Sequence, residues 1–511
     1  MPFWKKISPR RSQVRKNISA ERFSQISRLA NTNFLISILI WLLFVVLCTL
    51  IMSLPRAGYL EVIPIAATVS LISLAGALYI YHYQRRITRN HARALVLVCL
   101  FLLMLAVTKL GVSITQHNYS FWATGAAVTT AVILTIAYDQ RFAMGIGVFF
   151  CLLACFAVGP MPDGGPQPTN INLFLTMAAG VVTCCFCLKE IRTRIKLLKV
   201  STLAAIVVFA TACAVEFMSE DPKLVDIIKH AAIHAGTTLG VGLLIQSLLP
   251  LIEKSFRIAT SMTLLDYSDA NQPLLKRLHM EAPGTFSHSL LIGSIAEAAA
   301  EAIGRNGLLC RVGAYYHDIG KINKASYFVE NELGSASRHK ELAPTMSHLI
   351  IVGHVKDGIE MAKEYGLPTV LRQFIETHHG TTLIEPFYHE AKKLKSKNSK
   401  GKSTDPPSES EFRYPGPKPR TKEAAIVMLV DTSESAVRSL AEVTLTKIEA
   451  VVHNMAMKRL QDGQFDECDL SLRELSQIEA SISKTLAAHY HGRIAYPHPP
   501  DVPAETESQT E

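Results

Sequence analysis

The sequence predicts an all-α protein with a polytopic helical membrane domain followed by an all-helical, water-soluble domain. The chain has 511 residues, enough for two or three domains, and 49% of them are hydrophobic. This apolar character is concentrated before residue 252. After Ile252 apolar residues recur at helical spacing, without the alternation that marks strands. Of ten cysteines, eight lie in apolar runs, which argues against a disulfide framework and for a reducing compartment.

Eight apolar segments predict the membrane domain, over residues 34–252. A helix needs about 20 apolar residues to cross a bilayer. The segments are expected near 34–54, 60–82, 94–114, 121–138, 142–158, 171–188, 200–218 and 227–250. A cleaved signal peptide at the first segment is disfavoured by the length of the apolar run and by the lack of a clean cleavage site.

The connections between these segments alternate in charge. The tail 1–33 carries eight Lys or Arg residues, and the second connection carries Arg85, Arg86, Arg89 and Arg93, whereas the odd-numbered connections carry almost none. By the positive-inside rule, the tail and everything after residue 252 face the cytoplasm, which requires an even number of spans. We therefore predict a multi-pass protein of a bacterial-type cytoplasmic membrane, with both termini cytoplasmic.

The net charge of +9 has the same explanation. Many of the basic residues flank apolar segments, where lipid head groups and topology account for them. A lipid bilayer is thus an expected partner and a nucleic acid polymer is not. The sequence is also compatible with an oligomer.

Among the ionisable residues inside the expected spans, two pairs stand out. Lys109 and Glu216 are near span ends, where they can reach the head groups. His230 and His234 share one helix face, and we expect them to make polar contacts between packed helices rather than to bind an ion.

The soluble domain is expected over residues 253–497, followed by a disordered tail at 498–511. Thr285 or Ser287 is expected to cap the helix that carries His288. The stretch 392–420 is rich in Lys, Ser and Pro and predicts a flexible insertion, after which helix resumes at Glu423.

The chemistry is indicated by the run Tyr316-His-Asp-Ile-Gly-Lys321 and the residues around it. A dinuclear hydrolytic centre needs nitrogen and oxygen ligands and a carboxylate that bridges two metals. Asp318 is the candidate bridge. Any one histidine could be structural, but a whole set on one helical domain predicts a metal site: His288, His317, His354, His378, His379 and Asp431.

Several runs in this domain strongly resemble the HD-domain phosphohydrolases of the seven-transmembrane-receptor HD family. The runs are Glu281–His288, Val312–Lys321, His354–Gly358, His378–Thr381, Phe412–Lys418 and the single residue Asp431, and the resemblance extends from about residue 265 to 497 and to the spans before it. It implies that His288, His317, Asp318 and Asp431 hold one metal, and that His354, His378 and His379 hold the other, with Asp318 bridging. The resemblance also implies that the metals are iron or manganese. It further implies that the domain hydrolyses cyclic di-AMP to pApA.

Two metals would activate a water for attack on phosphorus and neutralise the growing charge on the phosphate oxygens.

Lys321 follows the His-Asp pair by one helical turn and could reach a phosphate, or it could be a solvated lysine. Arg413 and Tyr414 are weaker candidates for contacts to phosphate and base.

The sequence departs from the family in one respect. Only a few residues separate the first two spans, whereas members of the family usually carry a large extracytoplasmic domain there. This difference puts the sensing of an outside signal in doubt, but it does not affect the phosphohydrolase chemistry.

Alternative functions stay open at this point. Another nucleotide could be the substrate: cyclic di-GMP, a guanosine alarmone or a nucleoside phosphate. The cyclic di-GMP branch usually carries Gly-Tyr-Pro after its paired histidines, whereas here Gly380-Thr-Thr-Leu383 follows. A nucleotide-binding receptor without catalysis and a transporter are the other classes. The complete ligand set disfavours a receptor without catalysis. The lack of paired broken spans disfavours a transporter.

Overall fold

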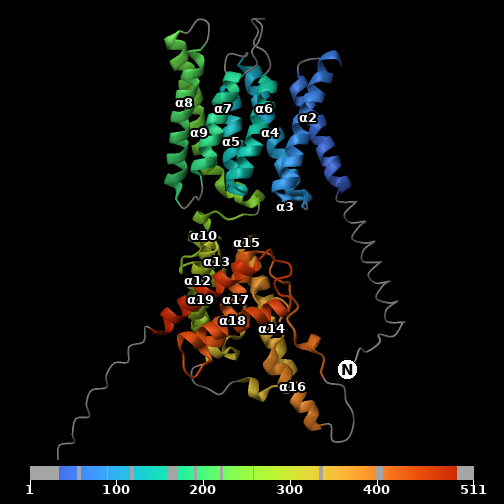
Figure 1. Ribbon diagram of the computed structural model, residues 1–511, viewed down its shortest axis with the longest axis vertical. Helices are drawn as coiled ribbons and strands as arrows, with labels where there is room; N and C mark the ends of the chain where they lie inside the picture. Colours follow the sequence, from blue (N-terminus) through green and yellow to red (C-terminus); the bar gives the residue numbers. More distant parts are fainter. Residues whose placement is uncertain are drawn as a thin grey trace, which may run out of the picture. The chain divides into compact units, whose positions relative to one another are not determined.

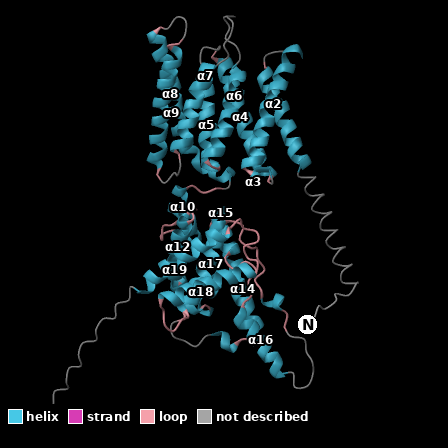
Figure 2. Cartoon of the chain, in the orientation of Figure 1, coloured by secondary structure: helices cyan, strands magenta, loops and turns pink. Residues whose placement is uncertain are grey.

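The structure is a computed structural model that describes residues 34–54, 59–88, 90–115, 120–158, 171–188, 193–218, 223–256, 258–332, 338–398 and 407–491. Helices dominate these ranges (Figures 1 and 2). The only strand-like pairing among them is an isolated antiparallel bridge between Leu383 and Arg413. The predicted all-α class is confirmed. The chain divides into two compact units, one ending at Met262 and one beginning at Thr263.

The first unit is a bundle of apolar helices. They are Phe34–Ser53, α2 (Tyr59–Tyr83), α4 (His91–Ile114), α5 (Phe121–Ala137), α6 (Gln140–Val158), α7 (Ile171–Cys187), α8 (Arg194–Glu216) and α9 (Leu224–Phe256), with the short α3 (Arg85–Thr88) between α2 and α4. Each of the eight predicted segments is therefore a helix. Six are long and apolar enough to cross a membrane, and α5 and α7 are apolar but shorter. This is a multi-pass membrane protein.

The shorter helix α5 lies inside this bundle. It is buried from Ala123 to Thr135 without interruption. A helix that is apolar on all sides is one that packs against neighbours all round. Its contacts with α4, α6, α7 and α9 account for that pattern.

The histidines of α9 make the expected contacts between helices. The His234 ring lies 2.8 Å from Thr124 Oγ1 and 3.4 Å from Ser120 Oγ, and His230 Nδ1 lies 3.3 Å from Glu216 Oε1 on α8. Lys109 differs from the expectation, because its Nζ donates to the Ala157 carbonyl of α6 at 3.1 Å.

The second unit is built around α17 (Lys422–Arg438), whose residues Ala424 to Asp431 are all buried. It packs against α12 (Pro283–Ala302), α13 (Gly307–Tyr316), α15 (Thr369–Thr377), α18 (Leu445–Gln461) and α19 (Leu472–His491). The remaining elements are α10 (Ser261–Tyr267), α11 (Pro273–Glu281), α14 (Pro344–Glu364), α16 (Glu385–Asn398) and the 3-10 helices η1 (Ile319–Tyr327), η2 (Val329–Asn331), η3 (Arg338–Glu341) and η4 (Glu409–Phe412).

Two local predictions in this unit were wrong. Helix α12 begins at Pro283, so neither Thr285 nor Ser287 is its cap, and Thr285 Oγ1 donates instead to Glu330 Oε1 at 3.1 Å. Proline suits the first turn of a helix because its missing N–H would have no partner there. The prediction of a flexible insertion over residues 392–420 is wrong at both ends. Helix α16 continues to Asn398 at one end, and Phe412 is buried at 1% exposure at the other.

Some predictions fall outside the described residues. They concern the tail 1–33, the connections at 55–58 and 159–170, the middle of the insertion at 399–406, and the tail 498–511.

Candidate metal centre

Asp318 lies between α13, which ends at Tyr316, and η1, which begins at Ile319. The backbone of η1 passes directly over α14, because a Cβ at Gly320 would lie 1.8 Å from the His354 carbonyl oxygen and 2.5 Å from the Gly358 nitrogen. Only glycine permits this approach. The glycine two residues after Asp318 therefore brings Asp318 close to His354.

The other predicted ligands come from four elements that surround this junction. His288 lies on α12, His354 on α14, and Asp431 on α17, while His378 and His379 directly follow α15. All are buried except His379, which is half-buried. His288 and Asp431 are 143 residues apart, yet His288 Nε2 is 3.1 Å from Asp431 Oδ1.

These residues form two groups that meet at Asp318. In one, Asp318, His354, His378 and His379 offer ligand atoms that all lie within 4.8 Å of one another; in the other, His288, His317 and Asp431 do so. Asp318 Oδ1 is 3.4 Å from both His354 Nε2 and His378 Nε2. Its other oxygen, Oδ2, is 3.1 Å from His317 Nε2 and 4.0 Å from His288 Nε2. One carboxylate thus presents one oxygen to each group.

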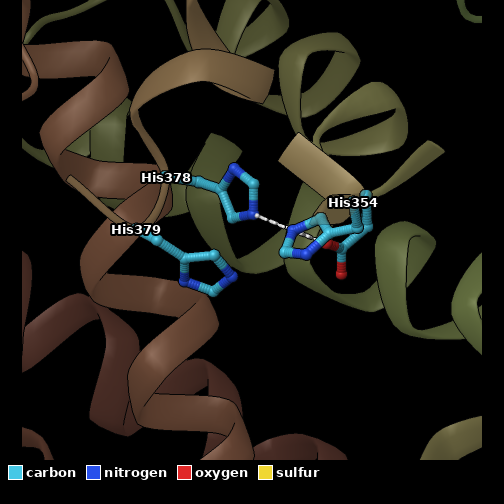
Figure 3. A group of neighbouring side chains, drawn as sticks. His354, His378 and His379 are labelled. Atoms are coloured by element: carbon cyan, nitrogen blue, oxygen red, sulfur yellow. Dashed lines mark hydrogen bonds and ion pairs between the residues drawn. The ribbon is translucent and has the colours of Figure 1, made fainter. Parts of the chain in front are cut away.

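The first group shows why these side chains suit a cation. His354 Nε2 and His378 Nε2 are 3.1 Å apart, the contact drawn as a dashed line in Figure 3. His378 and His379 approach His354 from the opposite side of the site (Figure 3). Two ring nitrogens that face each other, with a carboxylate oxygen beside them, are a typical arrangement of donors around a shared metal.

The rings are oriented by their Nδ1 atoms. His317 Nδ1 donates to the Ala314 carbonyl, His354 Nδ1 to that of Ile351, and His378 Nδ1 to those of Phe374 and Ile375. A proton fixed on Nδ1 leaves the Nε2 lone pair free for a metal.

His288 is held differently from the other three rings. Its Nδ1 lies 3.1 Å from Oε2 of Glu434, a carboxylate that is 2% exposed. Arg438 in turn lies 3.5 Å from Glu434 Oε2. His288 is thus the ligand with a charged partner behind it.

Burial and charge together set the protonation of the site. Burial would raise the pKa of Asp318, but its contacts with His317 and Lys321 hold that pKa well below its usual range. Burial lowers the pKa of His354 to about 3, so its ring is neutral at pH 7. Burial would also lower the pKa of His288, but its contacts with Asp431 and Glu434 raise it to about 9. A metal must therefore displace a proton at His288.

Two buried atoms are also suited to a bound cation. His317 Nε2 and Asp318 Oδ1 make no well-aligned hydrogen bond with the described residues. Buried polar atoms rarely lack a partner, and at these positions a cation supplies one. The donor set of imidazoles and carboxylates fits two divalent metal ions.

Lys321 is held between two carboxylates. Its Nζ is 2.7 Å from both Asp318 Oδ2 and Glu330 Oε1. Burial would lower the pKa of Lys321, but these two anions raise it, so the ammonium stays charged. An ammonium has three N–H donors, of which two are engaged here.

Arg413 and Tyr414 lie beside the site on an ordered segment. Arg413 Nη1 donates to the Thr381 carbonyl at 2.9 Å and is 3.0 Å from Asp462. The Tyr414 ring stacks on His379, with centroids 4.3 Å apart. The bridge between Leu383 and Arg413 brings this segment to the turn that follows the paired histidines. Tyr414 therefore borders the centre, whereas Arg413 is engaged within the protein.

The sequence reading missed three residues of this region. Glu434 and Glu330 support His288 and Lys321, and Gln464, which is fully buried, accepts from Thr381 N at 2.9 Å and donates to Asp462 at 2.9 Å. The spacing of Asp431 and Glu434, three apart on one helix, was a usable signal for Glu434. Glu330 and Gln464 act through long-range contacts that no local pattern reveals.

Comparisons with known proteins agree with this arrangement. Residues 59–260 match the family described as 7TM receptor with intracellular HD hydrolase, and residues 285–436 match the HD domain. Over 254 residues, half of the chain, it is 45% identical to the cyclic-di-AMP phosphodiesterase PgpH of Bacillus subtilis. Over 264 residues it is 43% identical to PgpH of Listeria monocytogenes. The chain spans 34% and 35% of these two relatives.

A solved structure is also similar. It is the HD domain of L. monocytogenes PgpH in complex with cyclic-di-AMP, with 43% identity and a TM-score of 0.41, and the match covers all of that chain and 43% of this one.

Proposed function

We propose that this chain, whose residues 59–260 match the family of 7TM receptors with an intracellular HD hydrolase, is a metal-dependent phosphodiesterase that hydrolyses cyclic di-AMP to pApA. The observation that carries the proposal is the pair of ligand groups that share Asp318. The substrate is proposed from the two PgpH relatives, both cyclic-di-AMP phosphodiesterases. We assign the catalytic domain to the second unit, which begins at Thr263, ten residues after the predicted start at residue 253.

Two divalent ions, iron or manganese, are proposed for this centre. Imidazole and carboxylate ligands suit both metals. His288, His317, Asp318 and Asp431 would hold one ion, and His354, His378, His379 and Asp318 the other. When bound, the two ions would activate a water and neutralise the non-bridging phosphate oxygens.

The residues of the chain set up this chemistry. Asp318 stays ionised, so both of its oxygens are available at once. Lys321 holds Oδ2 of Asp318 in place and keeps a donor for a phosphate oxygen. The backbone carbonyls behind His317, His354 and His378 fix the ring orientations before substrate arrives, which lowers the reorganisation needed in the reaction.

Tyr414 is proposed to contact the substrate base. Its ring is 8% exposed and stacked on His379, so an adenine that enters beside His379 meets an aromatic edge. Arg413 is proposed to support this segment, because Asp462 and Glu409 would have to release its guanidinium before it reached a phosphate.

The test is hydrolysis by the purified full chain in detergent. We expect protein loaded with manganese, or with iron under anaerobic conditions, to convert cyclic di-AMP to pApA. A parallel assay with cyclic di-GMP fixes the substrate, since equal or faster turnover of that nucleotide would overturn the assignment. Tight binding of cyclic di-AMP by the metal-loaded protein without hydrolysis would identify a receptor instead.

A further inference from the structure

The membrane unit contains an apolar pocket of about 170 Å³. It lies among the helix Phe34–Ser53, α2, α3, α4 and α6, the last four labelled in Figure 1. Trp41, Phe44, Gly76, Phe101 and Phe149 are among the residues that line it. This pocket is within one unit and involves none of the residues of the metal centre.

The polar side chains of the lining are already engaged. Trp41 Nε1 donates to Ser73 Oγ at 3.1 Å, and Ser73 Oγ donates to the Ser70 carbonyl at 3.2 Å. Ser37 and Thr88 also have partners of their own. The lining therefore offers a ligand little besides apolar contact. An apolar cavity of roughly 150 Å³ stays dry and takes up apolar molecules, so water is a poor occupant here.

Two walls of the pocket are helices with little cover inside the protein. Its walls include the two least buried long helices, because only 17% of the apolar stretch of Phe34–Ser53 and 11% of that of α2 is buried within the protein, against 56% for α6. In a bilayer the uncovered faces of such helices contact acyl chains. A lipid chain can therefore enter from the side.

The lining also lies toward one end of the bundle. It comes from residues 37–44 and 72–80, from residues 87–101, and from residues 146–153 in the middle of α6. The short helix α3, which joins α2 to α4, begins with Arg85 and Arg86, and Arg93 lies in the first turn of α4. Asp139 near this end is engaged by Gln84 Nε2 at 2.7 Å and by the Phe142 N–H at 2.8 Å. Arginines in the sequence at the ends of apolar helices favour an anionic lipid.

We propose that this pocket binds one acyl chain of an anionic phospholipid, whose head group lies at the end marked by α3. The helix Phe34–Ser53 is outside the residues that match the 7TM family. The site thus uses a wall that this family match does not include.

The experiment uses the full chain, delipidated in detergent, and phosphatidylglycerol as the probe. Native mass spectrometry counts lipid retained per chain, with phosphatidylcholine offered at equal concentration. We expect one retained phosphatidylglycerol in preference to phosphatidylcholine. Gly76→Leu fills the pocket, since a Cβ there meets only Phe149, at 3.8 Å. It should weaken retention about tenfold, the effect of losing two buried methylene groups.

A matched control is Gly240→Leu, because a Cβ at Gly240 meets nothing within 4 Å and Gly240 is not part of the lining. It should retain lipid as the wild type does. Gly76→Ala fills less of the pocket and should weaken lipid retention about fourfold, the effect of one methylene group. This variant keeps the test decisive if the leucine variant does not fold. Unchanged retention in the Gly76 variants, equal loss in Gly240→Leu, or equal retention of phosphatidylcholine would overturn the proposal.

Discussion

Asp318 occupies the central position in the proposed metal centre, because each of its oxygens faces a different ligand group. Replacing it removes an anion from both groups at once and leaves the buried Lys321 with Glu330 as its remaining carboxylate partner. The other ligands each contribute to one group. The effect of a substitution should therefore be larger at Asp318 than at any single histidine.

We predict that Asp318→Ala loses both metals and lowers hydrolysis of cyclic di-AMP on the order of 10³-fold, as expected for loss of a principal electrostatic group. Metal content by mass spectrometry and initial rates measure the two effects. Glu360→Ala is the control, since Glu360 is an exposed carboxylate on α14. Retained activity in Asp318→Ala would contradict the metal assignment.

Glu434 is predicted to tune the metal that His288 holds. Glu434→Gln keeps the size of the side chain but removes the charge behind His288 Nδ1. Losing such an outer partner typically lowers metal affinity about 10- to 100-fold. Calorimetric titration of metal into the metal-free protein should show one weakened site and one unchanged site. Glu442→Gln, at an exposed carboxylate, should leave both metal affinities unchanged. If both metal affinities of Glu434→Gln equalled those of the wild type, Glu434 would not have this role.

At the scale of elements, the centre depends on how closely η1 passes over α14. Gly320→Ala places a methyl group 1.8 Å from the His354 carbonyl oxygen, so the two elements must separate. We expect a loss of stability of about 1–3 kcal/mol, the usual effect of overpacking, together with loss of metal binding. Thermal unfolding of the full chain and metal titration would measure these effects.

Gly353→Ala is the matched control for this prediction. It lies on α14 one residue before His354, and a Cβ there meets only Lys324 Nζ, at 3.9 Å. Replacing a helical glycine with alanine should stabilise the protein by about 0.5–1 kcal/mol. If both variants behaved alike, the close approach at Gly320 would not be what positions Asp318.

The start of α19 gives a prediction for pH. Glu474 forms a capping box with Ser471 and pairs with Lys422, the first residue of α17, and its Oε2 lies 2.7 Å from Lys422 Nζ. The Lys422 contact and the bonds from Ser471 lower the pKa of Glu474 to about 2. A lowered pKa means that the stabilisation is present above the ordinary value near 4.5 and is lost as the pH falls toward 2.

Glu474→Gln should therefore destabilise the protein at pH 7 by about 0.5–1 kcal/mol. The difference from wild type should shrink as the pH falls from 4.5 toward 2. Chemical unfolding at a series of pH values measures it. A difference that grew with acidity would contradict the assigned pair.

Some elements could be predicted from the sequence and others could not, for physical reasons. The membrane helices follow from hydropathy and the metal ligands from a dense motif set. By contrast, α16 beyond Lys392 is a charged, exposed helix without an apolar face, so no periodicity marked it. Phe412 and Tyr414 lie among prolines, and their burial depends on pairing with the segment around Leu383. Contacts between distant segments decided these cases.

At the scale of the whole molecule, we predict that the HD domain faces the cytoplasm. The charge pattern supports this orientation, because basic residues gather in the tail 1–33 and in every second connection. If all eight apolar helices cross the bilayer, the chain returns to the side from which it started.

This orientation predicts the behaviour of reporter fusions. Green fluorescent protein after residue 491 should fluoresce in intact cells and alkaline phosphatase at the same site should be inactive, because the first folds in the cytoplasm and the second only outside it. The connection 159–170, which carries no basic residue, should give the reverse result. If the tail 1–33 is cytoplasmic, active phosphatase at the C-terminal site would mean an odd number of spans. In that case one of the shorter helices, α5 or α7, would be the first candidate for a segment that does not cross the bilayer, since each has only 17 residues.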